Sequence, residues 1–281
     1  MTKRALVCYC VDVDGCAIWI NTQDGSKANA SNISRGIFGA NVGLERLLKF
    51  FGQHDVKATF FTKNGLHGYT HERASLLTED QQRKVMAKSI EVYKDFTGKH
   101  PRGWAAPYWD VSPVSMQIME DFGIEYDHSL MHHDCQPYYA SDVGESVVHT
   151  DYSEDPDTWM VPMKQHRVTK VVKIPANWDV DDWPPLNPAP GRAGSHGFVN
   201  PRDVQQVWED QFSYLYEEYD TFVYCISIHP QVSGKSKVMP MHQRFMEFLK
   251  KHDGVEFVPA EFVCDEFKAG RISGATFQMG V

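Results

Sequence analysis

Two aspartates close the first apolar run of the chain. Asp12 and Asp14 stand in the segment Val-Asp-Val-Asp-Gly, directly after the run Ala5–Val11. Because side chains alternate between the two faces of a strand, both carboxylates lie on one face and Val13 lies on the other. Two neighbouring carboxylates repel each other unless a cation or a proton lies between them. The pattern predicts that one aspartate binds a metal ion and the other acts as a base; a solvated strand end is the alternative.

Histidines supply further candidate ligands. His67 and His71 are four residues apart, so one helical turn would bring both imidazoles to one side, as in many metal sites. The chain has 13 histidines, so such a pair can also arise by chance. Joined to an aspartate, the pair would hold an ion and leave positions for water and substrate. The run His132–Cys135 (HHDC) also contains zinc-ligand types, but consecutive residues cannot all reach one ion.

A third histidine ends a late strand. His229 follows the β-rich run Phe222–Ile228 and precedes Pro230. If the sheet is parallel, this strand end lies at the same edge as Asp12 and Asp14, where catalytic groups of α/β proteins gather. A surface histidine that caps a strand is the alternative.

Strand and helix patterns alternate along the chain, which favours a parallel α/β architecture. Strands are expected at Ala5–Val13, Val56–Thr62, Gly103–Ala106, Val171–Pro175, Phe222–His229 and Val255–Val258. Helices are expected at Gly43–Phe51, Thr78–Thr97, Pro113–Gly123, Pro201–Tyr219 and Met241–His252. Since no internal repeat is visible, we expect a single domain over residues 1–281.

Composition excludes several classes of protein. The 281 residues include 28 Lys and Arg and 37 Asp and Glu, a formal charge of −9, which argues against nucleic acid or an anionic membrane as partner. Apolar residues make up 42% of the chain, enough for a core. No run approaches the ~20 apolar residues of a membrane span. Six scattered cysteines and the absence of a signal-peptide pattern predict a cytoplasmic protein with reduced thiols.

Together these motifs resemble the polysaccharide deacetylase (NodB-homology) family of metal-dependent amide hydrolases. The family's paired aspartates are matched by Asp12 and Asp14. Its His-x-x-x-His motif is matched by His67 and His71, and its late histidine by His229. The segments GWAAPYWDVSP, YDHSLMHHDCQPYY and SIHPQVSG are most similar to a branch with peptidoglycan-deacetylase-like, cyclic-imidase-like and allantoinase-like proteins.

The resemblance implies a distorted (β/α) barrel of about seven parallel strands with a divalent metal ion, usually zinc, at their carboxyl ends. Asp14, His67 and His71 would hold the ion. Asp12 would take a proton from the attacking water, and His229 would protonate the leaving nitrogen.

Further roles follow from the third motif and from tryptophans. The resemblance implies that the backbone N–H of Tyr108, which follows Pro107, helps to bind the oxyanion of the reaction. Trp109, Trp178 and Trp183 could line a substrate pocket, although each could equally belong to the core.

The sequence departs from the family pattern at two places. Many members carry an arginine two residues before the proline of the third motif, where it pairs with the catalytic aspartate; here that residue is Ala105. The link Lys63–Leu66 is shorter than the about 10–12 residues of a parallel crossover. We therefore expect one βα unit to be shortened near residues 62–67, or else an antiparallel strand pair there.

These features predict a metal-dependent hydrolase of non-peptide C–N bonds, acting on an N-acetyl sugar or on a small cyclic imide or ureide. The small substrate is favoured because Ala105 replaces the arginine and no signal peptide is recognised. Related proteins are often oligomeric, so we expect a homo-oligomer, with the loops Cys135–Met160 and Trp183–Gly197 as candidate subunit arms.

Two further functions are compatible with parts of the sequence. In a haloacid-dehalogenase-like phosphatase, Asp12 would attack phosphorus, Asp14 would act as acid and base, and Asp181 and Asp182 would hold magnesium. In a non-catalytic barrel that serves as a binding or assembly subunit, the short link Lys63–Leu66 would mean that a βα unit beside the histidine ligands is lost.

Overall fold

The strands form two sheets. The computed structural model describes residues 3–22, 27–62, 67–141, 148–162, 167–188 and 199–276, to which the statements on structure below refer. One sheet contains β1 (Arg4–Val13), β2 (Thr59–Thr62), β7 (Thr221–Ile228) and β8 (Val255–Phe257), with β1 in the centre. The other has the order β3 (Gly103–Trp104), β4 (Tyr126–Asp127), β6 (Val168–Lys173) and β5 (Tyr138–Ser141).

Parallel pairing dominates both sheets. β2, β7 and β8 all pair in parallel with β1, and β3, β4 and β6 pair in parallel with one another, so seven of the eight described strands are parallel. Only β5 is antiparallel, against β6. A parallel bridge between Asp181 and Ser227 extends the pairing at the end of β7. The predicted α/β class with parallel strands is confirmed.

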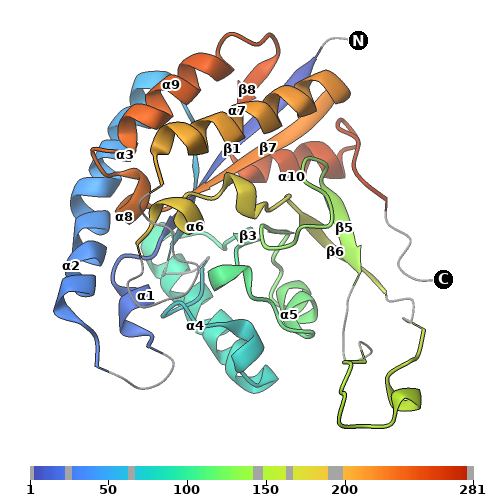
Figure 1. Cartoon of the computed structure of the whole chain (residues 1–281). Helices are drawn as coiled ribbons and strands as arrows, with labels where there is room; N and C mark the ends of the chain where they lie inside the picture. Colours follow the sequence, from blue (N-terminus) through green and yellow to red (C-terminus); the bar gives the residue numbers. More distant parts are fainter. Residues whose placement is uncertain are drawn as a thin grey trace.

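Helices occupy the segments between strands (Figure 1). The longer ones are α2 (Ala30–Phe38), α3 (Leu44–His54), α4 (Glu79–Thr97), α5 (Ser115–Asp121), α7 (Pro201–Glu218), α9 (Met239–Leu249) and α10 (Ala260–Lys268). Short helices are α1 (Ala17–Ile20), α6 (Trp183–Leu186) and α8 (Pro230–Ser233). A π-helical turn, Gly39–Gly43, joins α2 to α3. None of the described helices is long and apolar enough to cross a membrane.

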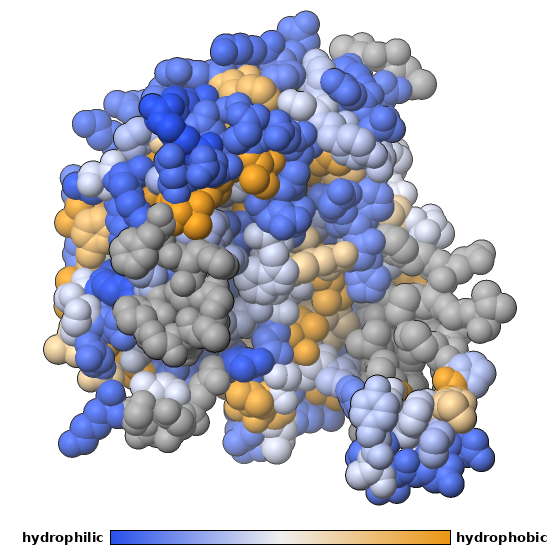
Figure 2. Space-filling model, in the orientation of Figure 1, coloured by the Kyte–Doolittle hydropathy of each residue, from blue (hydrophilic) through white to orange (hydrophobic). Residues whose placement is uncertain are grey.

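The two faces of β1 pack into two different hydrophobic cores. Its odd-numbered residues, among them Val7 and Tyr9, pack in a core with α3, α7 and α9. Its even-numbered residues Leu6, Cys8 and Cys10 pack against side chains of β4, β6 and β7, in the interior that the two sheets share. Because both faces are buried, the strand reads as an almost continuous apolar run. The outer surface of α7 and α9 is mainly hydrophilic (Figure 2), as expected for amphipathic helices.

The predicted helices at residues 78–97 and 201–219 form as α4 and α7. Thr78 and Gln81 make a reciprocal capping box at the start of α4, and Asn200 caps α7 ahead of Pro201. The shortened link Lys63–Leu66 lies outside the described residues. In the described chain from residue 67 to residue 102 there is no strand, so no antiparallel partner for β2 occurs there.

Candidate active site

A carboxylate and two imidazoles converge beyond the carboxyl end of β1. Asp14 Oδ1 lies 3.5 Å from His67 Nε2 and 3.6 Å from His71 Nε2. The three residues are buried, with 0, 2 and 2% of their surface exposed. Asp14 Oδ2 accepts a hydrogen bond from the side chain of Gln231 at 2.9 Å, whereas Asp14 Oδ1 has no hydrogen-bond partner among the described residues. An orphaned buried carboxylate oxygen that faces two ring nitrogens fits a cation between them.

The two histidines come from a loop, and our expectation of a helical turn at residues 67–71 is wrong. Gly68 and His71 have left-handed φ values of +68° and +65°. A right-handed helix does not allow such values, and they are uncommon for residues other than glycine. Asn21 holds this conformation by donating its side-chain N–H to the carbonyl of His71 at 2.8 Å. The loop therefore brings the two rings together with centroids 5.0 Å apart.

Hydrogen bonding and burial prepare these groups for a metal ion. Nδ1 of His67 lies 2.9 Å from the carbonyl oxygen of Ala105; a carbonyl can only accept, so Nδ1 carries the proton and Nε2 presents a lone pair. Burial lowers the pKa of His67, which keeps the imidazole neutral. Burial also raises the pKa of Asp14, so that its ionised form needs a nearby cation. This donor set of two imidazoles and one carboxylate is typical of zinc and related divalent ions.

Asp12 lies between the candidate metal ligands and His229. Its Oδ2 is 3.9 Å from His67 Nε2 and 3.8 Å from His229 Nε2, and within the described part of the chain its Oδ1 has no hydrogen-bond partner. Burial raises the pKa of Asp12 to about 6, although the charge of His229 opposes the shift. A buried carboxylate with a raised pKa is a stronger base than an ordinary aspartate.

His229 is held by Asp182. Its Nδ1 lies 2.7 Å from Asp182 Oδ1, and its backbone N–H donates to the same carboxylate. Burial alone would lower the pKa of His229, but Asp182 raises it well above its usual value. The imidazole is thereby kept protonated, the state that a proton donor requires.

The hydrogen bonds continue behind Asp182. Ser233 Oγ donates to Asp182 Oδ2 at 2.5 Å, and His242 Nε2 lies 2.7 Å from Ser233 Oγ. Burial lowers the pKa of His242 to about 4, so this ring is neutral at pH 7 and donates its Nε2 proton to the serine. The chain of bonds fixes the orientation of Asp182 and, through it, that of His229.

A cavity of about 60 Å³ lies above these groups. Eight of the nine residues predicted for the site line it: Asp12, His67, His71, Tyr108, Trp109, Trp178, Trp183 and His229. The ninth, Asp14, lies behind them in contact distance of the histidine pair.

The aromatic residues form the walls of this cavity. The rings of Trp109 and Trp178 have centroids 4.5 Å apart, and the ring of Trp183 lies 4.9 Å from that of His229. Trp178 lines the cavity and is 45% exposed, so part of its aromatic surface is accessible to solvent there. Tyr108 and Trp109 have left-handed φ values of +58° and +51°, uncommon for residues with side chains and frequent at functional sites.

Sequence patterns do not identify the residues that hold the catalytic side chains in position. The sequence suggests Asp182 only as a magnesium ligand, and it does not single out Gln231, Ser233 or His242. For Asp182, the available sequence signal is the tandem Asp181-Asp182 just before Trp183. The run His132–Cys135 lies apart from the site: His132 contacts the hydroxyl of Tyr138 instead.

Comparisons with known proteins agree with this geometry. The family model described as polysaccharide deacetylase matches residues 63–126. A peptidoglycan deacetylase from Helicobacter pylori is 39% identical over 287 aligned residues, covering 95% of this chain and 97% of that protein. A peptidoglycan deacetylase-like protein from Gibberella zeae is 33% identical and covers 94% of this chain and 87% of its own.

Solved structures share the fold. A protein from Mycobacterium smegmatis assigned as a polysaccharide deacetylase superposes with a TM-score of 0.81 at 22% identity, covering 99% of this chain and 95% of that one. An allantoinase superposes with a TM-score of 0.73 at 20% identity, over 95% and 91% of the two chains. Near-complete coverage at 39% identity shows that the chain belongs to the polysaccharide deacetylase family.

Proposed function

We propose that this protein is a metal-dependent deacetylase that hydrolyses the acetamido group of an N-acetylated sugar. The observation that carries the proposal is the convergence of Asp14 Oδ1, His67 Nε2 and His71 Nε2 beside a cavity. Zinc is the ion that we propose, because two imidazoles and one carboxylate leave positions open for water and substrate. Such an ion, when bound, supplies Lewis-acid chemistry that acidifies a water and polarises an amide carbonyl.

Asp12 and His229 would carry the two proton transfers. Asp12, with its pKa near 6, takes a proton from the attacking water. His229, kept protonated by Asp182, gives a proton to the nitrogen that leaves. The backbone N–H of Tyr108 is proposed to bind the developing oxyanion, which its unusual left-handed conformation at the cavity supports.

The cavity favours an acetamido group attached to a larger molecule. It is lined by the candidate metal ligands and by the partly exposed Trp178, so an acetamido group can enter while the rest of the substrate stays outside. Trp178 offers exposed aromatic surface at the cavity, against which the apolar face of a sugar can pack. The names of the two relatives, both tied to peptidoglycan, support a polymeric N-acetyl sugar as substrate.

A small cyclic imide or ureide is the second candidate substrate. It is favoured by Ala105, which replaces the arginine of many polysaccharide deacetylases and is fully buried, with its carbonyl accepting from His67. The likeness to the allantoinase structure extends to the fold alone. A panel with both substrate classes separates the two candidates.

The geometry of the site disfavours a phosphatase and a non-catalytic subunit. A phosphatase would use Asp182 to hold magnesium, but this carboxylate is already engaged by His229 and Ser233. A non-catalytic subunit would follow from the short link at residues 63–66 only if the histidine site were lost, yet His67 and His71 still reach Asp14. The single domain, homo-oligomeric state and cytoplasmic location stay predictions.

Acetate release tests the proposed activity. Chelator-treated protein, supplied again with Zn²⁺, is expected to release acetate from N-acetylglucosamine oligomers or peptidoglycan. His71→Ala should reduce this turnover by at least about a hundredfold, because it removes one ligand of the ion. His54→Ala, a change of a histidine in α3 outside the cavity, serves as the control and should retain activity. Hydrolysis of a cyclic imide alone would transfer the assignment to the second substrate class, and equal turnover with and without Zn²⁺ would refute the metal site.

A further inference from the structure

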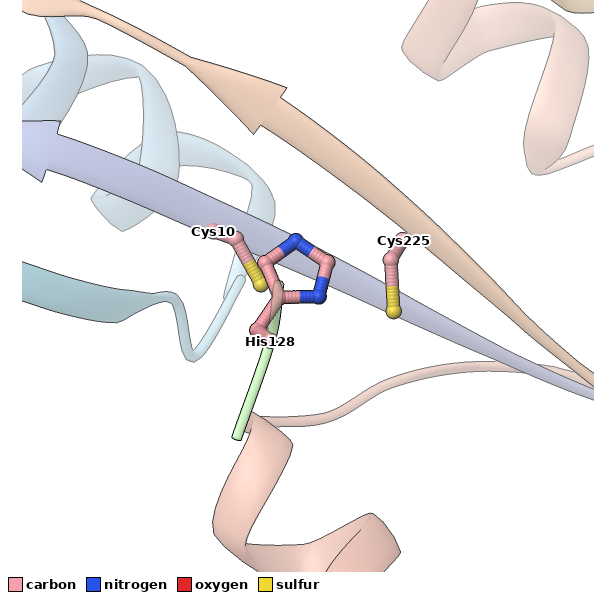
Figure 3. Close-up of side chains that lie close together, drawn as sticks. All are labelled: Cys10, His128 and Cys225. Carbon is pink, nitrogen blue, oxygen red and sulfur yellow. The ribbon is translucent and has the colours of Figure 1, made fainter. Parts of the chain in front are cut away.

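A second group of metal-ligand side chains lies in the interior shared by the two sheets. Cys10, His128 and Cys225 bring two sulfur atoms and a ring nitrogen within 4.8 Å of one another. Figure 3 shows the imidazole of His128 between the two cysteine side chains. All three residues are buried, with 0, 1 and 4% of their surface exposed. No step of the proposed reaction uses this group.

The three residues come from three separate parts of the fold. Cys10 lies in β1, Cys225 lies in β7, and His128 directly follows β4 of the other sheet. In the β1–β7 register Cys10 is opposite Ser227, and Cys225 is opposite Cys8, so the two cysteines are diagonal neighbours on one face. Since alternate residues of β1 share a face, Cys10 lies one layer below Asp12. An ion held here would link the two sheets beneath the active site.

The hydrogen bonds of His128 prepare it as a ligand. Its Nδ1 lies 3.1 Å from the carbonyl oxygen of Ile174, which can only accept, so Nδ1 donates and Nε2 is left for a metal ion. Ser227 Oγ lies 3.0 Å from this Nε2. This separation is close to the about 3.3 Å between two donor atoms of a tetrahedral site, which makes the serine oxygen a candidate for the fourth donor.

One of the two thiols, Cys10, is prepared as well, whereas hydrogen bonds with Cys10 and Cys8 raise the pKa of Cys225 well above its usual value, so that a bound cation has to displace the proton of Cys225. A hydrogen bond with Cys225, assisted by the charge of His128, lowers the pKa of Cys10 to about 6 against the effect of burial. The thiolate is the form that binds metals. Burial lowers the pKa of His128, but Cys10 raises it to about 9; a metal ion therefore competes with a proton on this ring, and binding releases protons to solvent.

The ligand types select the class of ion. Two thiolates and a neutral imidazole together carry a charge of −2. Because a buried net charge is costly, a divalent ion, which neutralises this charge, is favoured over a monovalent one. Thiolates favour zinc over magnesium or calcium. We propose that Cys10, His128 and Cys225 bind a thiophilic divalent cation, Zn²⁺ foremost, at a second site distinct from the Asp14 centre. Because the site is closed, its role is to brace β1 and β7 against the segment after β4.

Zinc-edge X-ray absorption of the wild-type protein provides a test that needs no variant. With two equivalents of zinc bound, the spectrum should contain a Zn–S distance of about 2.3 Å beside the Zn–N and Zn–O distances near 2.0 Å. The Asp14 centre offers no sulfur ligand, so a spectrum without Zn–S scattering would overturn the proposal. Four free thiols instead of six after anaerobic denaturation would also overturn it, since two cysteines would then be joined in a disulfide.

Cobalt substitution separates the two sites. Metal-free protein titrated anaerobically with Co²⁺ should bind two equivalents, one of them with a near-ultraviolet thiolate-to-cobalt charge-transfer band. Cys225→Ser should lose this band and one equivalent, whereas Cys264→Ser, a buried cysteine elsewhere, should keep both. Asp14→Asn should weaken the other equivalent and leave the band intact. A charge-transfer band that persists in Cys225→Ser would contradict the assignment, whatever the outcome for deacetylation.

Discussion

Three hydrogen-bond donors meet at the carboxylate of Asp182. They are the ring Nδ1–H and backbone N–H of His229 and the hydroxyl of Ser233. Asp182 is fully buried and lies outside the lining of the cavity, so its effect on the reaction passes through His229. It is therefore a positioning residue that also sets the charge of the proton donor.

Asp182→Asn is expected to lower kcat about a hundredfold with little change in KM, because the amide no longer stabilises the protonated imidazole. The pKa of His229 is held above its usual value by Asp182, and activity is lost as pH rises through that pKa. Without the carboxylate, the alkaline limb of the kcat profile should move to lower pH. Asp179→Asn, an exposed neighbour, serves as the control. An unchanged alkaline limb in Asp182→Asn would show that the carboxylate does not tune the histidine.

At single residues, sequence reasoning succeeds where one simple periodicity decides the geometry. The alternation of a strand places Asp12 and Asp14 on one face, and the structure agrees. The helical period fails for His67 and His71, because Gly68 and a left-handed His71 form a loop that i,i+4 spacing does not reveal. The hydrogen bonds that Ser233 donates to Asp182 and accepts from His242 join separate segments and leave no local pattern.

At the scale of elements, a buried ion pair joins β4 to β6. Lys173 and Asp127 are register partners, both with fully buried side chains, and their charged atoms are 3.1 Å apart. Asp127 also accepts a hydrogen bond from the hydroxyl of Ser129 at 2.6 Å. The Ser129 oxygen in turn accepts a hydrogen bond from the backbone N–H of Ala106 at 2.8 Å. Since Ala106 lines the cavity, the ion pair supports the wall of the active site.

Lys173→Met should lower the free energy of unfolding by about 3–5 kcal/mol, because it leaves the Asp127 carboxylate buried without its partner. The double variant Lys173→Met/Asp127→Asn should regain a large part of this loss, since it removes the uncompensated charge. Urea denaturation of the two single variants and the double variant completes the cycle. Additive losses would mean that the two groups do not interact.

Elements are predictable where a pattern is long. The six predicted strands all occur, although their ends are shifted. The strand β4 is not predicted, because its two residues are too few to show an alternating pattern. β5 lies within a segment whose composition indicates a loop, and α2 and α10 also lie outside the predicted helices. In α2 the apolar pattern is interrupted by Gly36, which packs closely on the backbone of Gly15, a long-range contact that local sequence does not encode.

At the scale of the whole molecule, α10 is fastened to the second sheet by charges. Arg102, just before β3, donates to Glu125 at 2.7 Å and to Asp265 of α10 at 2.5 Å. Lys268 of α10 also donates to Glu125. The side chains of Arg102, Glu125 and Lys268 are about one-third exposed and that of Asp265 is 49% exposed, so solvent screens their attraction.

Arg102→Met is expected to reduce the free energy of unfolding at pH 7 by about 1 kcal/mol. The hydrogen bond from Arg102 lowers the pKa of Glu125 from 4.5 to about 2. A lowered folded-state pKa contributes stability above pH 4.5, and this contribution is lost as pH falls through about 2. The difference between wild type and variant should therefore shrink between pH 5 and pH 3 in urea denaturation. A constant difference would point to lost packing of the arginine side chain instead.

Anomalous diffraction at the zinc edge, on crystals grown with Zn²⁺, tests the metal-dependent mechanism most directly. We expect a peak bonded, at about 2.0–2.2 Å, to Asp14 Oδ1, His67 Nε2 and His71 Nε2. Crystals of active protein with no anomalous peak at these three atoms would contradict that mechanism.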